Sequence, residues 1–315
     1  MQDLSGQIAN LALILLLFYS GCVFAHLIAR RANARPYIVG ALALLCGFLV
    51  AFGLSTLAMG DAWQGAALLL VLAALTALAL VRPVRVALAR VTPLEPDSLV
   101  DLFGLIALFW ALAIGLLSLF TVDLDAIAGQ LQITVTDSLV NVFMYVAIAF
   151  GLVGLWIVRG PRDAARRLGL TRPTWRQAAI AVGVVVPMLV VATGVDALGR
   201  LLQPDRYAQL ERVLNAMSSN VTSPAIALLL GLCAGIGEEL LFRGAIQARF
   251  GVALTTLLFG VAHTQYGPSF ALLGVLFLGV TFALERKYMN TTTAIITHAL
   301  YNTVAFFLNT LAGGS

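Results

Sequence analysis

Long apolar segments recur along the whole chain, and they constrain its fold more than any other feature. A helix needs about 20 apolar residues to cross the hydrocarbon core of a bilayer. Only 11% of the 315 residues are Asp, Glu, Lys or Arg, whereas soluble domains contain about 25%. The sequence therefore predicts an all-α fold, a polytopic transmembrane helical bundle.

We expect about ten spans in this bundle, because ten segments have the required length and apolar character. Their approximate bounds are 8–29, 36–59, 62–81, 98–120, 138–158, 177–201, 223–247, 251–265, 268–285 and 291–312. The eighth segment is short for a full crossing, so we expect it to be broken or re-entrant.

Arginines are concentrated in alternate loops between these segments. The first, third, fifth and ninth loops are basic, and the sixth is mixed. The second and fourth loops contain the acidic residues Asp61, Asp123, Asp125 and Asp137. By the positive-inside rule, this alternation predicts that both termini lie outside. The Arg-rich, Lys-poor loops are typical of a prokaryotic cell membrane. The net charge of +4 therefore reflects orientation and does not indicate a nucleic-acid partner.

The first residues of the chain and the three cysteines each lead to a further expectation. The first ten residues lack the basic start of a secretory signal, so the first span is expected to be an uncleaved anchor. All three cysteines fall within apolar segments and lack CxxC spacing, which favours small buried side chains over a disulfide framework or a zinc motif.

A polar, arginine-rich loop divides the chain into two halves. Residues 1–160 form an N-terminal transmembrane region of about five spans, whose role is not evident from its residues. Residues 161–176 form a basic cytoplasmic loop, and residues 177–312 form a C-terminal half with the remaining spans. The halves share no convincing internal repeat, which weakens an interpretation as an inverted-repeat transporter.

Three charged residues interrupt the seventh apolar segment. Each charge in the centre of a lipid-facing helix costs about 2.5–3.5 kcal/mol on insertion scales, so buried charges of this kind indicate function or pairing. Glu239 and Arg243 are four residues apart and share one helical face. Glu238 points about 100° away from Glu239. We expect Arg243 to neutralise Glu239 and to leave Glu238 free to face a cavity.

Two histidines follow this cluster in other apolar segments. Phe259 and His263 are four residues apart, as are His298 and Asn302. The helical rise places Glu238, His263 and His298 roughly 13, 18 and 10 Å from the inner ends of their segments. Because these depths overlap, the sequence predicts that three helices present the polar groups to one cavity.

Such a set of side chains has two chemical interpretations. A carboxylate beside an imidazole can hold and deprotonate a water, and a second imidazole with a carboxamide can donate to a developing oxyanion. Alternatively, Glu238, His263 and His298 are plausible zinc ligands. The HExxH spacing of zinc proteases is absent. An ion-pair network and hydrogen-bonded core histidines are the structural alternatives.

The three segments "EELLFR", "FGVAH" and "HALYN" resemble the EExxxR, FxxxH and HxxxN motifs of the CPBP family of intramembrane proteases. That family includes the type II CAAX prenyl endopeptidases and bacterial bacteriocin-processing and immunity proteins. The resemblance covers about residues 175–312 and implies a CPBP-like intramembrane protease domain over 177–312. It implies an endopeptidase acting on a membrane-embedded or lipidated peptide or protein, with CAAX-type substrates included.

The resemblance also implies roles for individual residues. Glu238 corresponds to the catalytic glutamate, His263 to its water-activating partner, and His298 with Asn302 to the oxyanion site. Glu239 and Arg243 support the first helix, and Phe259 belongs to the second motif. The family has been described both as metalloendopeptidases and as glutamate-dependent. We favour the glutamate interpretation, with no cofactor and zinc as the alternative, because the HxxxN pair suits donors better than ligands.

A function from another class fits some of the same residues. An array of glutamate and histidine across helices also suits proton relay. The alternative to an endopeptidase is therefore a proton-coupled membrane transporter or a non-catalytic membrane scaffold.

Overall fold

The computed structural model describes residues 4–31, 33–59, 63–130 and 133–313. Within these ranges the chain is all-α and contains no named strand, which confirms the predicted fold class. The N-terminal region contains α1 Leu4–Ile28, α2 Arg35–Ala58, α3 Trp63–Leu80, α4 Arg82–Ala89, α5 Leu99–Thr121, α6 Leu124–Gln130 and α7 Val135–Leu152. Asp61, one of the loop acids used for orientation, lies outside the described residues.

The C-terminal half follows a short helix in the basic loop. Its elements are α8 Pro161–Arg167, α9 Trp175–Gly183, α10 Val185–Leu202, α11 Pro204–Ser218, α12 Pro224–Glu238, the π-helix η1 Glu239–Ile246, α13 Gln247–Ala262, the 3₁₀-helix η2 Thr264–Tyr266, α14 Phe270–Tyr288 and α15 Thr291–Gly313. Helix starts follow ordinary capping chemistry. Pro224 occupies the first turn of α12, and Thr134 with Asp137 forms a capping box before α7.

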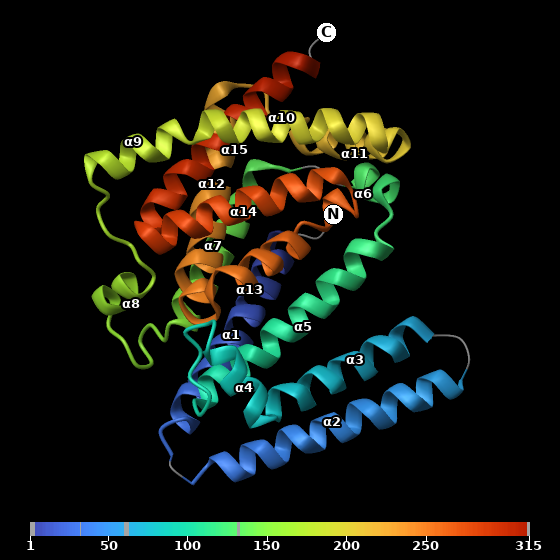
Figure 1. Cartoon of the computed structure of the whole chain (residues 1–315), viewed down its shortest axis with the longest axis vertical. Coiled ribbons are helices and arrows are strands. Elements are labelled where there is room, and N and C mark those ends of the chain that lie inside the picture. Colours follow the sequence, from blue (N-terminus) through green and yellow to red (C-terminus); the bar gives the residue numbers. More distant parts are fainter. Residues whose placement is uncertain (1–3, 32, 60–62, 131–132, 314–315) are drawn as a thin grey trace.

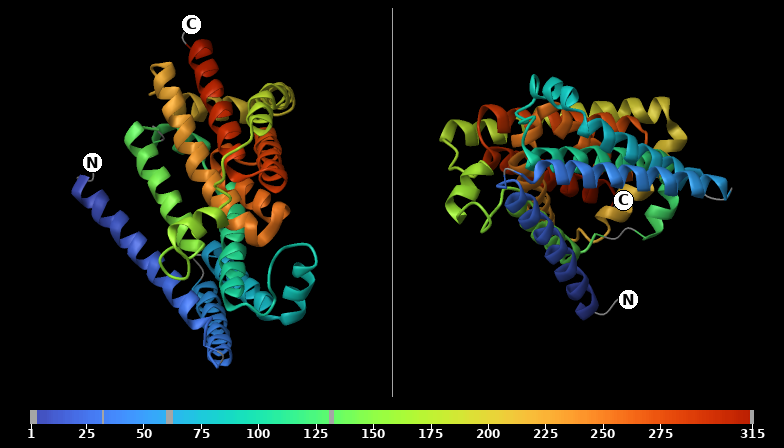
Figure 2. Two further views of the ribbon diagram at one scale, coloured as in Figure 1. Left: turned by 90° about the vertical axis from the view of Figure 1, so that its left-hand side faces the viewer. Right: turned by 90° about the horizontal axis from the view of Figure 1, so that it is seen from below.

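The α2–α3 hairpin of the N-terminal region lies apart from the helices that carry the motifs, whereas α5 and α7 pack against those helices. Helices α2 and α3 form a hairpin that packs on α5 at one end, away from α12, α14 and α15 (Figures 1 and 2). Helix α12 packs most extensively against α15 and then α7. Gly235 permits this approach, because a Cβ added there would lie 2.8 Å from the backbone nitrogen of Ala299. The first and third motifs are thereby brought side by side.

An ion pair between α5 and α13 helps to join the two halves. Asp101, in the first turn of α5, pairs with Arg249 of α13, and its second oxygen accepts from the Glu95 backbone nitrogen at 2.7 Å. Helices α5 and α13 also contact closely, since a Cβ on Gly104 would lie 2.9 Å from the Phe250 ring. The N-terminal region therefore braces the helix that carries the second motif.

The expectation of ten spans is wrong by the criterion of length and composition. Among the described residues, six helices are long and apolar enough to cross a membrane. Three of the missing spans have clear causes. The seventh and eighth expected spans form one apolar stretch from Pro224 to Ala262, which turns at Gly251 (φ 76°). Helix α14 ends in charged residues, and α15 carries threonines and the third motif, so neither reaches the required apolarity.

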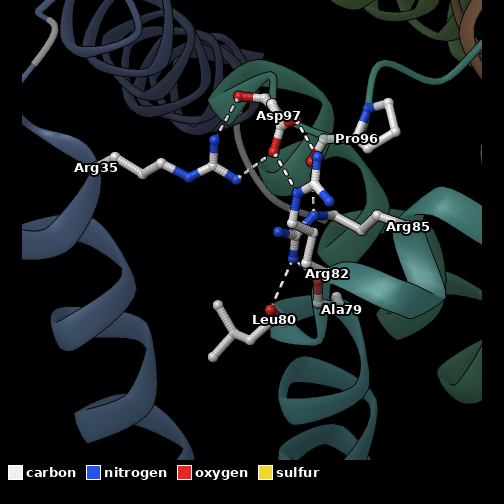
Figure 3. Close-up of polar contacts among 7 residues, drawn as sticks. All are labelled: Arg35, Ala79, Leu80, Arg82, Arg85, Pro96 and Asp97. Atoms are coloured by element: carbon white, nitrogen blue, oxygen red, sulfur yellow. Dashed lines mark hydrogen bonds and ion pairs between the residues drawn. The ribbon is translucent and has the colours of Figure 1, made fainter.

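A polar cluster holds the base of the α2–α3 hairpin (Figure 3). Asp97 accepts from Arg35 at 3.0 Å and from Arg82 at 2.9 Å. The hydrogen bonds from Arg82 first, and then from Arg35, lower the pKa of Asp97 to about 2. Arg85 is buried and donates to the carbonyls of Ala79 at 2.6 Å and Leu80 at 2.8 Å. These bonds satisfy carbonyls at the C-terminal end of α3 that the helix leaves unpaired.

Candidate active site

The three motifs lie on three neighbouring helical segments. Glu238 is the last residue of α12, and η1 continues directly with Glu239 and Arg243. His263 follows the end of α13, and His298 with Asn302 lies on α15. The side chains meet at a cavity of about 570 Å³ whose lining includes Glu238, His263, His298 and Asn302. The predicted convergence of these four residues on one cavity is therefore confirmed.

Glu238 faces His263 across this cavity. The Oε2 atom of Glu238 lies 3.8 Å from Nε2 of His263, and their side chains are 20% and 18% exposed. Among the described residues, Oε2 of Glu238 has no hydrogen-bond partner. The Nδ1 atom of His263 lies 2.7 Å from the Phe259 carbonyl. A carbonyl can only accept, so Nδ1 carries a proton, and Nε2 is the ring nitrogen that faces Glu238.

Glu239 lies between the side chains of Arg243 and His298 in the protein interior. Its Oε2 is 3.1 Å from Nε of Arg243, and both side chains are fully buried. The predicted pairing of Glu239 with Arg243 is confirmed. The other carboxylate oxygen lies 2.8 Å from Nδ1 of His298. This second contact was not predicted, because His298 is 59 residues away along the chain and no helical spacing relates the two.

An aromatic cluster surrounds the buried charges. The Arg243 guanidinium lies over the Phe259 ring, 4.6 Å from its centroid, and 5.9 Å from that of Phe282. Among the described residues the Arg243 nitrogens make no aligned hydrogen bond. The guanidinium is therefore stabilised by its ion pair with Glu239 and by these aromatic rings. Phe259 also approaches His263 at 4.5 Å between centroids, and Phe282 stacks on His298 at the same distance.

The cavity continues well beyond the four motif residues. From Glu238 and His263 it extends along α10, past Thr193 and Asp196, to Met217 and Ser218 at the end of α11. Other lining residues that the motifs did not indicate are Leu189, Tyr266, Ala271, Val275, Tyr301, Phe306 and Asn309. Much of this wall is apolar. No local pattern in the sequence indicates that the helices forming it contribute to the cavity.

A metal ion would need ligands that converge more closely than these side chains do. Among the described residues, no group of three His, Cys, Asp or Glu side chains is arranged to hold a metal ion. His263 and His298, two of the three sequence-based candidates, each use Nδ1 for a protein partner and so have Nε2 available for a ligand. It is the arrangement of the side chains, not their donor atoms, that argues against a metal ion. As arranged, Glu238, His263 and His298 therefore do not fit a three-ligand zinc site.

The comparisons with known proteins bear on this part of the chain. Residues 220–304 match the family model of type II CAAX prenyl endopeptidase Rce1-like proteins. The match contains all three motifs and lies within the predicted domain 177–312. Neither the comparison with curated proteins nor that with solved structures gave a match. The chain is thus an integral membrane protein whose residues 220–304 resemble the type II CAAX prenyl endopeptidases, as its motifs predict.

Proposed function

We propose that this protein is an intramembrane endopeptidase in which Glu238 and His263 activate a water molecule to hydrolyse a peptide bond. The observation that carries the proposal is the convergence of Glu238, His263, His298 and Asn302 on one cavity. Family similarity over residues 220–304 supports the same class of reaction.

In the first step a proton passes from water to Glu238, and the water oxygen forms a bond to the carbonyl carbon of the substrate. A water can lie within hydrogen-bond reach, about 2.8 Å, of both Oε2 of Glu238 and Nε2 of His263, because these atoms are 3.8 Å apart. Glu238 accepts a proton from this water as the oxygen attacks the scissile carbonyl carbon. The same proton then passes to the leaving nitrogen, so the carbon–nitrogen bond breaks without a covalent enzyme intermediate.

The oxyanion of the tetrahedral intermediate is held by His298 and Asn302. Nδ1 of His298 is bound to Glu239, so Nε2 is the nitrogen left to donate into the cavity. It can do so as an imidazolium, which the Glu239 carboxylate stabilises. Arg243, Glu239 and protonated His298 together carry one net positive charge. That charge favours a developing oxyanion in a site of low dielectric constant.

The substrate is proposed to be a membrane-associated peptide or protein. A cavity of about 570 Å³ lies within the ordinary range of ligand pockets, about 300–1,000 Å³, and its apolar wall suits an extended peptide with apolar side chains. The family similarity makes a CAAX-type, prenylated peptide the first substrate to assay.

Zinc remains the alternative source of activated water. Its candidate ligands would be Glu238, His263 and His298, which in the described structure are not arranged to hold a metal ion, and a bound metal would supply a water of lowered pKa. The proton transfer is assigned to Glu238 instead, because among the described residues no group of three His, Cys, Asp or Glu side chains is arranged to hold a metal ion.

Replacing Asn302 by alanine tests the oxyanion role and the choice between enzyme and transporter. We expect the cleavage rate to fall by about 100- to 1,000-fold, as when one oxyanion donor is removed elsewhere, with the melting temperature unchanged. The measurement uses proteoliposomes with a fluorogenic peptide, with and without a prenyl group. If the proteoliposomes instead take up the peptide under a pH gradient without cleaving it, and if Asn302→Ala does not change this uptake, the result would support the proton-coupled transporter.

A further inference from the structure

Three half-buried arginines outside the cavity are without a carboxylate partner. They are Arg159 after α7, Arg167 in α8 and Arg286 near the end of α14. Within the described parts of the chain, none has an acidic side chain within 4.0 Å, and the one acid of segment 159–176, Asp163, pairs with Arg166. Half-buried cations without a counter-ion are costly, so this arrangement calls for an anion from outside the chain.

Backbone carbonyls fix the three side chains in place. Arg159 donates to Val153 at 2.6 Å, Arg167 to Ala248 at 3.1 Å and Arg286 to Arg243 at 3.3 Å. Each bond uses one nitrogen of a guanidinium that offers five donors. Among the described residues the remaining donors make no further hydrogen bond, so they are available to an anion.

The three arginines lie in or against one segment of the chain, α8 and the residues that flank it. The Arg286 guanidinium lies against Gly169, two residues after Arg167; a Cβ there would be 2.6 Å from its central carbon. Gly169 has φ +75°, so it ends α8 in a conformation that glycine adopts readily. Arg159 lies two residues before the seven-residue helix α8, and Arg167 is the last residue of that helix, so these two charges belong to one short segment outside the spans.

Exposed aromatic side chains mark this end of the molecule as a membrane interface. Trp156 is 78% exposed and has φ 58° in the turn that leads to Arg159, a conformation rare for a bulky residue. Trp175 and Tyr288 are exposed too, beneath the cations of Arg176 at 5.5 Å and Lys287 at 5.3 Å. Tryptophan and tyrosine at the ends of spans lie at the level of lipid headgroups.

We propose that Arg159, Arg167 and Arg286 bind the phosphate of an anionic phospholipid headgroup, in the leaflet at this end of the molecule. Guanidinium groups match phosphate oxygens in bidentate geometry, and basic pockets between membrane helices bind such headgroups. The headgroup contacts Arg286, which donates to the carbonyl of Arg243, and thus lies next to η1, the element that carries Glu239. The site is separate from the cavity, and its occupancy is measured without cleavage.

Native mass spectrometry of the purified chain in an uncharged detergent tests this site. At physiological ionic strength, salt screens the attraction between the protein surface and lipid charges beyond about 8 Å. Lipid that stays on the protein is therefore lipid whose headgroup is bound directly. We expect phosphatidylglycerol to bind at least about tenfold more tightly than phosphatidylcholine with the same acyl chains. The double variant Arg159→Gln/Arg167→Gln should lose about tenfold or more of this affinity, because each charge-assisted hydrogen bond contributes about that factor.

A matched control separates the site from general surface charge. The double variant Arg162→Gln/Arg172→Gln removes two exposed arginines of the same loop and should leave lipid affinity within about twofold. Equal losses of lipid affinity in the two double variants would contradict the proposed site. Equal binding of the two lipids by the wild-type chain would contradict it as well, and this second comparison needs no variant. Inorganic phosphate is added in a further arm; displacement of the lipid at equimolar phosphate would show that a free anion is the occupant and overturn the proposal.

Discussion

Replacing Glu238 by glutamine should reduce peptide cleavage by about 10²- to 10⁴-fold, the usual contribution of a positioned general base. Glutamine has the shape of glutamate but cannot accept a proton from water. The cavity lining and the Glu239–Arg243 pair are left in place by this change. Cleavage of a fluorogenic membrane peptide in proteoliposomes measures the rate, and the melting temperature in detergent shows whether the variant is folded.

The control is the same chemical change at an exposed glutamate. Glu95 lies in the loop before α5, away from the cavity, so Glu95→Gln should keep the wild-type rate within about twofold. Wild-type activity in folded Glu238→Gln protein would remove Glu238 from the mechanism.

Breaking the buried ion pair should have the largest effect on stability. Arg243→Met leaves the Glu239 carboxylate fully buried with only His298 as a partner. Removing one member of a buried pair costs about 3–5 kcal/mol, and the expected readout is a large fall in melting temperature. Glu239→Gln should be similarly destabilising, because it leaves Arg243 without its counter-ion.

The double variant Glu239→Gln/Arg243→Met should be more stable than the sum of the two single changes implies, since neither Glu239 nor Arg243 is then left as a buried charge without the other. Asp196 and Arg200 provide a matched control, because they are also four residues apart and pair at 2.9 Å but are nearly half exposed. Arg200→Met should cost less than about 1 kcal/mol. Equal costs at the two pairs, or a stable Glu239→Gln protein without activity, would reverse the structural role given to Glu239.

Local spacing was enough to predict part of the site. Residues four apart on a helix lie on one face, so the sequence indicated the pairing of Glu239 with Arg243. The overlapping depths of Glu238, His263 and His298 in their segments indicated a shared cavity. Both expectations rest on helical geometry alone, which holds for any long apolar helix.

The remaining features depend on contacts between distant segments. The hydrogen bond between Glu239 and His298 and the stacking of Phe282 on His298 arise because α12, α14 and α15 pack together. The π-helical turn of η1 has no signature in the residues it contains. Fewer helices than expected meet the criterion of length and apolarity, because two expected spans form one stretch that turns at Gly251 and because charged or polar residues lower the apolarity of α14 and α15.

The central claim is that protein side chains alone activate the water in this cavity, and cleavage by metal-depleted protein tests it most directly. After exhaustive chelation and verification of the metal content, the wild-type chain in proteoliposomes should cleave the peptide at its original rate. The Glu238→Gln chain should remain inactive under the same conditions. Loss of cleavage on chelation, with recovery on adding an equimolar amount of zinc, would contradict the account.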